Sequence, residues 1–200
     1  IKVPVVLTSV NTISKKGKKY YSSVGIDNSK SAYKAVRYLI EKGHKKIALV
    51  LGEVNDLGVS WWRLDGYKKA LGENNIDIDD ELIISGEYNS GTAYENVNKL
   101  LKKRKDITAI FALSDIMALG AIKAAIDNGL DVPRDISIVG FDGMDESKYY
   151  NPSITTVKQP KKKMAETSVE LLFSLITTDG ENKHVILDTE LVERDSCFNI

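Results

Sequence analysis

Two acidic residues and a serine stand next to apolar segments, where their side chains could hold a polar ligand. Ser114 and Asp115 directly follow the nearly unbroken apolar run at 107–113, and Asp142 directly follows the mostly apolar segment 136–141. Carboxylates accept hydrogen bonds, whereas a serine hydroxyl both donates and accepts them. The three side chains could therefore bind hydroxyl or amide groups. The alternative is purely structural: Ser114 and Asp115 cap a helix, and Asp142 makes a turn.

Arg63 and Tyr88 add a cation and an aromatic ring to this set. Arg63 lies in the first turn of a predicted helix, where a cation opposes the helix dipole at a cost of about 0.3–1 kcal/mol. A residue in an energetically unfavourable position indicates a functional role. The structural alternative is that Arg63 forms a surface salt bridge with a nearby carboxylate. Tyr88 follows a predicted strand at 82–84. An arginine, carboxylates and an aromatic wall suit a polar small molecule such as a sugar or a nucleobase.

Catalytic and metal-binding patterns are missing from the sequence. The two histidines, His44 and His184, lie far apart, and His44 is expected to be solvated in a Lys-Gly-His-Lys-Lys turn. Cys197 is the only cysteine, which excludes an internal disulfide and a cysteine-rich zinc site. No glycine-rich phosphate loop and no metal-ligand spacing occurs. We therefore expect no catalytic residue, no metal and no cofactor.

The charge balance argues against a DNA-binding surface within these 200 residues. Lysine plus arginine number 28, as do aspartate plus glutamate. A neutral chain lacks the basic footprint that phosphate backbones require, so any DNA contact would lie outside these residues. The basic cluster at 99–105 ends a predicted helix and is expected to be solvated. No apolar run of 18 residues occurs, so we expect no transmembrane helix and no membrane partner.

The central part of the chain has the pattern of a strand, a helix and a second strand. An apolar strand at 107–113 leads into a helix that ends near Gly129 and Pro133, and a second strand follows at 136–141. Such βαβ units are almost always right-handed, with parallel strands. Ser114, Asp115 and Asp142 would then meet at the carboxyl edge of the sheet, where ligands bind in open α/β folds.

The same alternation continues along the chain and predicts an α/β fold with mostly parallel sheet. The expected strands cover 3–7, 24–26, 47–51, 82–84, 107–113, 136–141, 185–187 and 190–192, and the expected helices include 29–42, 90–103, 116–128 and 161–176. An extended segment between Pro152 and Pro160 reads as a crossing between two lobes. Two hinged lobes would place a ligand cleft between the strand ends.

Several motifs, in this order, resemble the effector-binding core of the lactose-repressor (LacI/GalR) family of transcriptional regulators. They are Arg-Leu-Asp-Gly-Tyr at 63–67, Ala-Leu-Ser-Asp-Ile-Met-Ala-Leu-Gly-Ala at 112–121, the segment 133–143 around Val-Gly-Phe-Asp-Gly, and Ser-Ile-Thr-Thr-Val at 153–157. Asp27-Asn28 and the turn at 42–47 match as well, and the resemblance runs from residue 1 to about 197.

The resemblance implies a two-lobed, periplasmic-binding-protein-like α/β fold whose first lobe is incomplete. The family's DNA-binding helix-turn-helix, its hinge and its first strands are expected to lie outside this chain. Residues 1–52 and 158–178 would form the remainder of the N-terminal lobe. Residues 53–157 and 179–200 would form the C-terminal lobe.

By motif position, the resemblance assigns effector binding to five residues. These are Arg63, Tyr88, Ser114, Asp115 and Asp142.

The predicted helix at 116–128, with its small residues Gly120, Ala121 and Ala124, resembles a dimer-interface helix. Ordinary packing on the sheet is the alternative for this helix.

The function that the resemblance implies is ligand sensing by a bacterial DNA-binding transcriptional regulator. A small sugar-like or nucleobase-like effector would bind between the lobes and control operator binding by a cytoplasmic homodimer. DNA would be contacted only through a domain outside this chain. The alternative is a periplasmic-type sugar-binding transport receptor, which shares the fold. An enzyme on an α/β scaffold is a third possibility, which the missing nucleophile–base set disfavours.

Overall fold

The computed structural model describes residues 3–9, 21–53, 58–178 and 181–200, in two compact units. The smaller unit comprises Ile1–Asp27 and Gln159–Thr189, and the larger one comprises Asn28–Lys158 and Glu190–Ile200. In the described ranges, no helix combines the length and apolar character that a membrane span needs.

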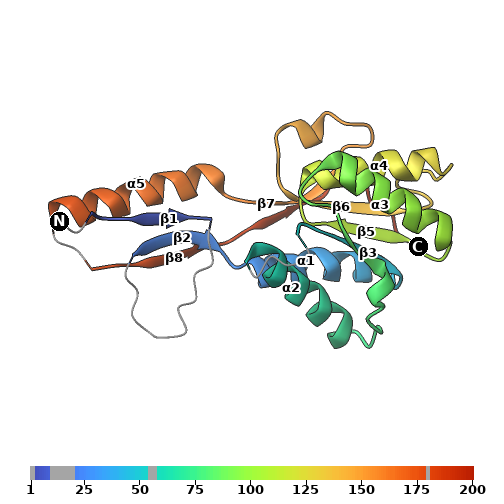
Figure 1. The fold of residues 1–200 in the computed structure, drawn as a ribbon, viewed down its shortest axis with the longest axis horizontal. Helices are drawn as coiled ribbons and strands as arrows, with labels where there is room; N and C mark the ends of the chain where they lie inside the picture. Colours follow the sequence, from blue (N-terminus) through green and yellow to red (C-terminus); the bar gives the residue numbers. More distant parts are fainter. Residues whose placement is uncertain (1–2, 10–20, 54–57, 179–180) are drawn as a thin grey trace. The chain divides into compact units, whose positions relative to one another are not determined.

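The smaller unit is a parallel three-stranded sheet with one helix packed on it (Figure 1). Its strand order is β1 (Val6–Thr8), β2 (Ser22–Ile26) and β8 (His184–Leu187). The central strand β2 is buried along its whole length. Helix α5 (Lys161–Thr177) contacts β1 and β2.

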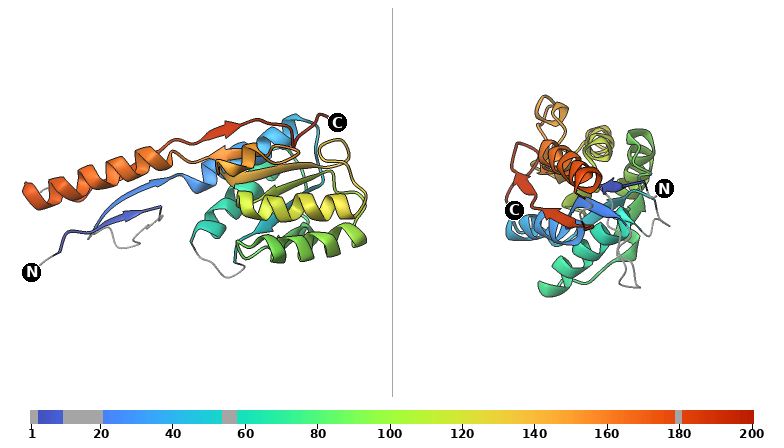
Figure 2. Two further views of the ribbon diagram at one scale, coloured as in Figure 1. Left: turned by 90° about the horizontal axis from the view of Figure 1, so that it is seen from above. Right: turned by 90° about the vertical axis from the view of Figure 1, so that its left-hand side faces the viewer.

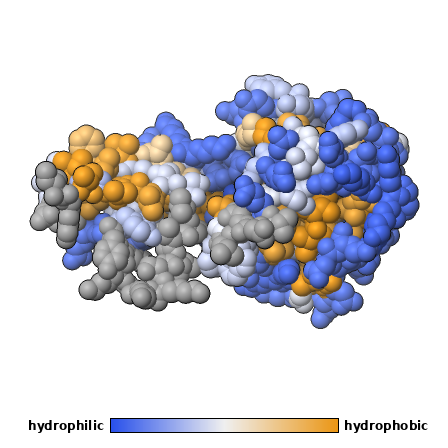
Figure 3. All heavy atoms as spheres, in the orientation of Figure 1, coloured by the Kyte–Doolittle hydropathy of each residue, from blue (hydrophilic) through white to orange (hydrophobic). Residues whose placement is uncertain are grey.

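Helix α5 also carries an exposed apolar stripe. Val169, Phe173 and Ile176 recur at helical spacing and are each more than half exposed. Figure 3 shows apolar residues gathered over this helix. The apolar residues of α5 therefore only partly serve the core of the smaller unit.

The larger unit is built on a six-stranded sheet in the order β4-β3-β5-β6-β7-β9. All neighbours pair in parallel except β7 and β9, which are antiparallel. The strands are β3 (Ile47–Leu51), β4 (Ile83–Ser85), β5 (Ala109–Ala112), β6 (Ser137–Asp142), β7 (Thr155–Lys158) and β9 (Glu190–Val192). Strands β3 and β5 are entirely buried, which explains their unbroken apolar sequences. The predicted mostly parallel α/β fold is confirmed.

Two pairs of helices cover the two faces of this sheet (Figures 1 and 2). Helices α1 (Asn28–Glu41) and α2 (Val59–Glu73) pack together on one face, and α3 (Ser90–Lys103) and α4 (Asp115–Asp127) pack together on the other. Two short 3₁₀ helices, Asp80–Leu82 and Glu146–Lys148, complete the unit.

A glycine sits at the contact within each helix pair. A Cβ atom on Gly66 of α2 would lie 2.2 Å from the carbonyl oxygen of Ser29 in α1. A Cβ atom on Gly120 of α4 would lie 2.2 Å from the carbonyl oxygen of Ser90 in α3. Gly120 therefore serves packing within this unit, so its small size needs no dimer to explain it.

The order of the strands reverses at β3. The chain passes from β3 to β4 on one side and then returns to β5 on the other side. The loops at the carboxyl ends of such neighbouring strands diverge, and ligands of open α/β sheets bind there. In this unit the position lies after Leu51, the end of β3, and Ala112, the end of β5.

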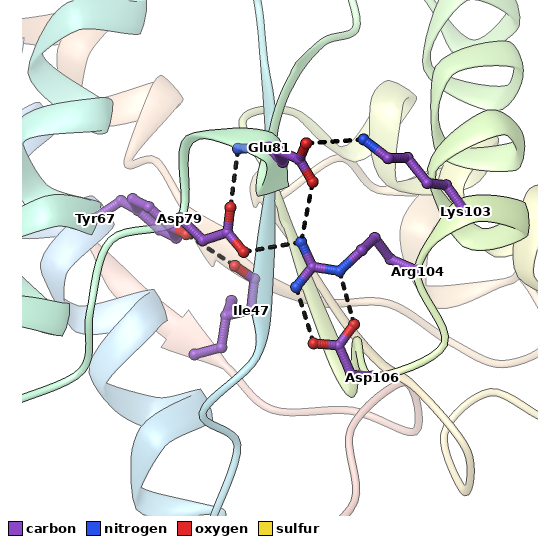
Figure 4. Close-up of polar contacts among 7 residues, drawn as sticks. All are labelled: Ile47, Tyr67, Asp79, Glu81, Lys103, Arg104 and Asp106. Atoms are coloured by element: carbon purple, nitrogen blue, oxygen red, sulfur yellow. Dashed lines mark hydrogen bonds and ion pairs between the residues drawn. The ribbon is translucent and has the colours of Figure 1, made fainter.

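A network of ion pairs closes the opposite, amino-terminal edge at β4 and β5 (Figure 4). Arg104 Nη1 lies 2.8 Å from Asp79 Oδ2, and its Nη2 lies 2.8 Å from Asp106 Oδ2. Lys103 pairs with Glu81 at 2.8 Å. The Arg104 guanidinium lowers the pKa of Asp106 to about 2. The expectation that the basic cluster is simply solvated is wrong for Arg104, whose side chain is only 19% exposed.

His44 is also buried, so the expectation that it is solvated is wrong. Its Nε2 atom lies 2.9 Å from Ser137 Oγ and 3.2 Å from the carbonyl oxygen of Phe198, and its Nδ1 lies 3.1 Å from Thr108 Oγ1. The C-terminal segment covers the turn and excludes water. This burial lowers the pKa of His44.

The two units divide the chain at other points than we expected. The sequence predicts residues 1–52 in the N-terminal lobe and residues 179–200 in the C-terminal lobe. Residues 28–52, which include β3, instead belong to the larger unit, and residues 181–189, which include β8, belong to the smaller one. Strand β3 belongs to the larger unit because it pairs with β4 and β5. Strand β8 belongs to the smaller unit because it pairs with β2. These pairings join segments that are distant in sequence, which a chain-order division misses.

Candidate functional site

Arg63 is buried on the side of α2 that faces the sheet, with only 5% of the residue exposed. Its Nε donates to Asn28 Oδ1 at 2.9 Å, and its Nη1 donates to the carbonyl oxygen of Leu113 at 2.5 Å. The guanidinium carbon also lies 3.5 Å from the centre of the Phe141 ring, a cation–π contact. Three elements thus fix the arginine at the carboxyl ends of β5 and β6.

Asp142 faces this guanidinium across a longer distance. Its Oδ1 lies 3.8 Å from Arg63 Nη2, and its side chain is 27% exposed. This separation is beyond hydrogen-bond range, so the attraction is that of an ion pair. A partly exposed carboxylate beside a buried cation can accept hydrogen bonds from a polar ligand while its charge stays compensated.

The backbone at Asp142 adopts a conformation that side-chain-bearing residues seldom take. Its φ is +103°, and Gly143 follows with φ +62°. Such a conformation costs a residue with a Cβ atom about 1–3 kcal/mol and persists only where the surroundings enforce it. A Cβ atom on Gly143 would lie 2.7 Å from Lys158 Cα, so this position requires glycine. The turn expected after the strand is present, and its strain fixes the direction of the Asp142 side chain.

Ser114 and Asp115 have partners within the protein. Ser114 is the N-cap of α4, and its Oγ accepts a hydrogen bond from the Met117 amide at 3.2 Å. Asp115 is 1% exposed. Its Oδ1 accepts from Thr156 Oγ1 at 2.6 Å, and its Oδ2 accepts from the Met144 amide at 2.7 Å. Ser114 therefore has the capping role of the alternative interpretation, whereas Asp115 does not cap the helix but bonds the Met144 amide and Thr156.

Tyr88 lies over the end of β3, on the same edge of the sheet. Its ring packs so closely on Gly52 that a Cβ atom there would lie 2.0 Å from Tyr88 Cε2. Its hydroxyl lies 2.9 Å from Ser60 Oγ in the first turn of α2. The residue is 39% exposed. Tyr88 therefore presents an aromatic surface one helical turn from Arg63.

All five predicted residues lie at the carboxyl edge of the larger sheet, four of them at or shortly after strand ends. Arg63 lies in the second turn of α2 and not in the first turn as predicted, because the helix begins at Val59. Arg63 and Asp142 are in direct electrostatic contact, whereas Ser114 and Asp115 face protein groups. The sequence reasoning missed Phe141 and Thr156 as partners of this site. Both lie in apolar or β-branched strand segments that read only as core, so no local signal separated them.

The donor set fits an organic ligand better than a metal ion. Among the residues that the structure describes, no three His, Cys, Asp or Glu side chains cluster so as to hold a metal. A buried guanidinium, a half-exposed aromatic ring and a partly exposed carboxylate instead provide hydrogen bonds and an apolar surface, which are the usual components of a small-molecule site.

Comparisons with known proteins agree with this class of fold. Residues 36–197 match the family model of the periplasmic binding protein-like domain. The chain is 96% identical over 200 residues to the HTH-type transcriptional regulator MalR of Clostridium butyricum. The alignment covers all of this chain and 59% of that protein, so the chain spans less than two thirds of this relative.

Solved structures of transcriptional regulators have the same fold as this chain. A complex of the transcriptional regulator CelR with cellobiose superposes with a TM-score of 0.86 at 31% identity, over 96% of this chain and 58% of that one. A regulatory protein of the LacI family from Chloroflexus aggregans superposes with a TM-score of 0.86 at 30% identity, over 95% of this chain and 68% of that one.

The chain belongs to the periplasmic binding protein-like domain family and, within it, to the LacI family of transcriptional regulators. It corresponds to the effector-domain part of such a regulator, and the family resemblance seen in the sequence is confirmed. These relatives are regulators of transcription by name, in agreement with the expectation that the chain is not an enzyme.

Proposed function

We propose that the carboxyl edge of the larger sheet binds a small sugar-like effector and that the chain is the ligand-sensing part of a bacterial transcriptional regulator. The observation that carries the proposal is the pair formed by Arg63 and Asp142. A buried guanidinium fixed by two hydrogen bonds stands 3.8 Å from a partly exposed carboxylate on a strained turn. Strain and buried charge of this kind concentrate at functional sites.

The chemistry of the pair matches that of a sugar. Vicinal hydroxyls of a sugar ring can donate to the Asp142 carboxylate and accept from the Arg63 guanidinium, both of which point in fixed directions. The exposed face of Tyr88 can pack on the apolar C–H face of the ring. Ser114 and Asp115 complete the proposed site as residues that support these contacts. The cellobiose found in the CelR complex is a sugar ligand of a relative with the same fold.

Control of DNA binding is part of the same proposal. The name of the Clostridium butyricum relative includes a helix-turn-helix, and this chain covers 59% of that protein. DNA would be bound by a part outside this chain, in a cytoplasmic homodimer. The effector would shift the dimer between states by binding one arrangement of the lobes more tightly than the other. A periplasmic-type transport receptor shares the fold, but the relatives named as regulators favour a role in transcription.

Isothermal titration calorimetry of the chain tests the proposal. The titrants are cellobiose, its α-linked isomer maltose, and ribose, with adenine as a nucleobase control. We expect saturable one-site binding of at least one sugar, with loss of binding in the Tyr88→Ala and Asp142→Ala variants. Binding of adenine alone would change the ligand class, and failure of every titrant would remove the support for a sugar effector.

A further inference from the structure

We propose that Asp115 and Thr156 are positioning residues that hold the strained turn at Asp142 in its binding geometry. This inference rests on the proposed function, since Asp142 is the ligand-contacting carboxylate there. Asp115 is assigned by this proposal to the support of the site and not to contact with the effector.

The first observation is that the Asp115 carboxylate joins three segments of the chain. It is carried by the first residue of α4 and is 1% exposed. One oxygen accepts from Thr156 of β7 at 2.6 Å, and the other accepts from the backbone amide of Met144 at 2.7 Å. Met144 stands two residues after Asp142. The carboxylate therefore ties the exit of the turn to the core of the larger unit.

Thr156 provides a second tie to the same turn. Its Oγ1, which donates to Asp115, also accepts a hydrogen bond from the Gly143 amide at 3.3 Å. The two consecutive amides after Asp142, those of Gly143 and Met144, are thus each held by a side chain of this pair. A left-handed backbone persists only where neighbouring groups enforce it, and these two bonds supply that enforcement.

The sheet itself leaves room for the carboxylate. Gly140 of β6 pairs in register with Thr156 of β7. A Cβ atom on Gly140 would lie 2.3 Å from Asp115 Oδ1, so any larger residue would displace the carboxylate. Gly140, Thr156 and Asp115 therefore pack together as one cluster. Because Gly140 has no side chain, strand β6 leaves space for the Asp115 carboxylate at this point.

The proposal predicts a specific consequence of breaking the arrangement. Without the two bonds, the backbone at Asp142 relaxes towards an ordinary conformation and its carboxylate changes position relative to Arg63. Effector affinity then falls through Asp142 and not through any contact of Asp115 with the ligand. A merely structural role would lower stability in general without this coupling.

Amide hydrogen exchange measured by NMR on the chain without ligand tests the local part. In Asp115→Ala the Met144 amide and the Thr156 hydroxyl lose their acceptor, so we expect exchange at Gly143 and Met144 to rise about tenfold, as for a lost hydrogen bond. Thr156→Val should do the same, whereas Thr156→Ser, which keeps the hydroxyl, should restore protection. Asp127→Ala is the matched control, because it removes an ion-paired carboxylate at the other end of α4.

Calorimetry with cellobiose tests the coupling by a double-mutant cycle. Thr156→Val should weaken binding about tenfold in the wild-type background and have no effect in the Asp142→Asn background. Equal effects in both backgrounds, or unchanged exchange at Gly143 and Met144, would overturn the proposal. If wild-type protein binds no cellobiose, the proposed function fails for that sugar, while the exchange experiment still decides whether Asp115 and Thr156 hold the turn.

Discussion

Two arginines of the larger unit, Arg104 and Arg63, lie at opposite edges of its sheet and are paired very differently. Arg104, at the amino edge, makes two hydrogen bonds to Asp106, at 2.8 and 2.9 Å, and a third to Asp79 at 2.8 Å (Figure 4). Arg63, at the carboxyl edge, donates to neutral oxygen atoms of Asn28 and Leu113 and stands 3.8 Å from the Asp142 carboxylate.

Under the proposed function, this difference distinguishes a structural ion network at Arg104 from a ligand site at Arg63. The carboxylates around Arg104 approach it as closely as hydrogen bonds allow, on a backbone without strain at those positions. Asp142 stops short of Arg63 and is held on a strained turn. Charge alone does not distinguish the two arginines; distance, burial and backbone geometry do.

The largest effect should come from Arg63→Met. The change removes the guanidinium and leaves the buried oxygens of Asn28 and Leu113 without this donor. A hydrogen bond to a charged group contributes about 1.5–3 kcal/mol, so loss of the bonds between the guanidinium and the sugar should lower sugar affinity by a factor of about 100 or more. Calorimetry measures the affinity, and circular dichroism verifies folding. Arg104→Met is the control, with affinity within about twofold of wild type. An equal loss of sugar affinity in both variants would contradict the different roles assigned to the two arginines.

Asp142→Asn should have the next largest effect. Asparagine tolerates positive φ, so the turn and the melting temperature should be retained. The loss of a charged acceptor should weaken sugar binding about tenfold or more. The comparison variant is Asp106→Asn, which should lower the melting temperature and leave affinity unchanged. A reversed outcome, with binding lost only in Asp106→Asn, would contradict the assignment of the two edges.

His44, at the amino edge, should make the stability of the larger unit depend on pH. Burial lowers the pKa of His44 below its ordinary value of 6.5, so the unfolded chain binds a proton more readily than the folded one. Its contribution to the free energy of unfolding is full above pH 6.5 and is lost as the pH falls through the lower pKa of the folded state. Urea unfolding between pH 7.5 and 5 measures this loss. His44→Gln should flatten the profile in that range, and an unchanged profile would show that other groups cause it.

The smallest expected effect is the contribution of Asp106 to the free energy of unfolding at acid pH. Arg104 lowers the pKa of Asp106 from 3.8 to about 2, so the folded chain holds this carboxylate ionised where the unfolded chain protonates it. The stabilisation is present above about pH 4 and is lost as the pH falls towards 2. The pair is at the surface, so salt should weaken it. Acid unfolding of wild type and Asp106→Asn, at low and high salt, measures the difference. A salt-independent difference would argue against an ion pair as its origin.

Local patterns in the sequence predicted the strands and helices well. The helix predicted at 90–103 is α3, and the strand predicted at 47–51 is β3, because caps and apolar runs mark both directly. The placement of Ser114, Asp115 and Asp142 at one edge follows from parallel strands that share a carboxyl edge. These inferences use only neighbouring residues and one topological rule.

Contacts between distant segments could not be predicted in the same way. His44 is buried by Phe198, more than 150 residues later, and its own turn gives no sign of this. The hydroxyl of Thr156 meets Asp115 from a strand 41 residues away. The assignment of β8 to the smaller unit depends on its pairing with β2. In each case the deciding partner lies far along the chain, where local periodicity carries no information.

Under the proposed function, Arg63 belongs to a sugar site and Arg104 to a structural network. The most direct test is a thermal-shift screen of wild type, Arg63→Lys and Arg104→Lys against cellobiose, maltose and ribose. Lysine keeps the charge but lacks the planar fork of arginine, so both variants change geometry and not charge. A sugar that binds the folded state raises its melting temperature by mass action.

We predict that at least one sugar raises the melting temperature of wild type and of Arg104→Lys, and that none raises that of Arg63→Lys. A sugar that stabilises all three proteins equally would contradict the assignment of Arg63 to the site. The absence of any shift in wild type would contradict the sugar-binding function itself.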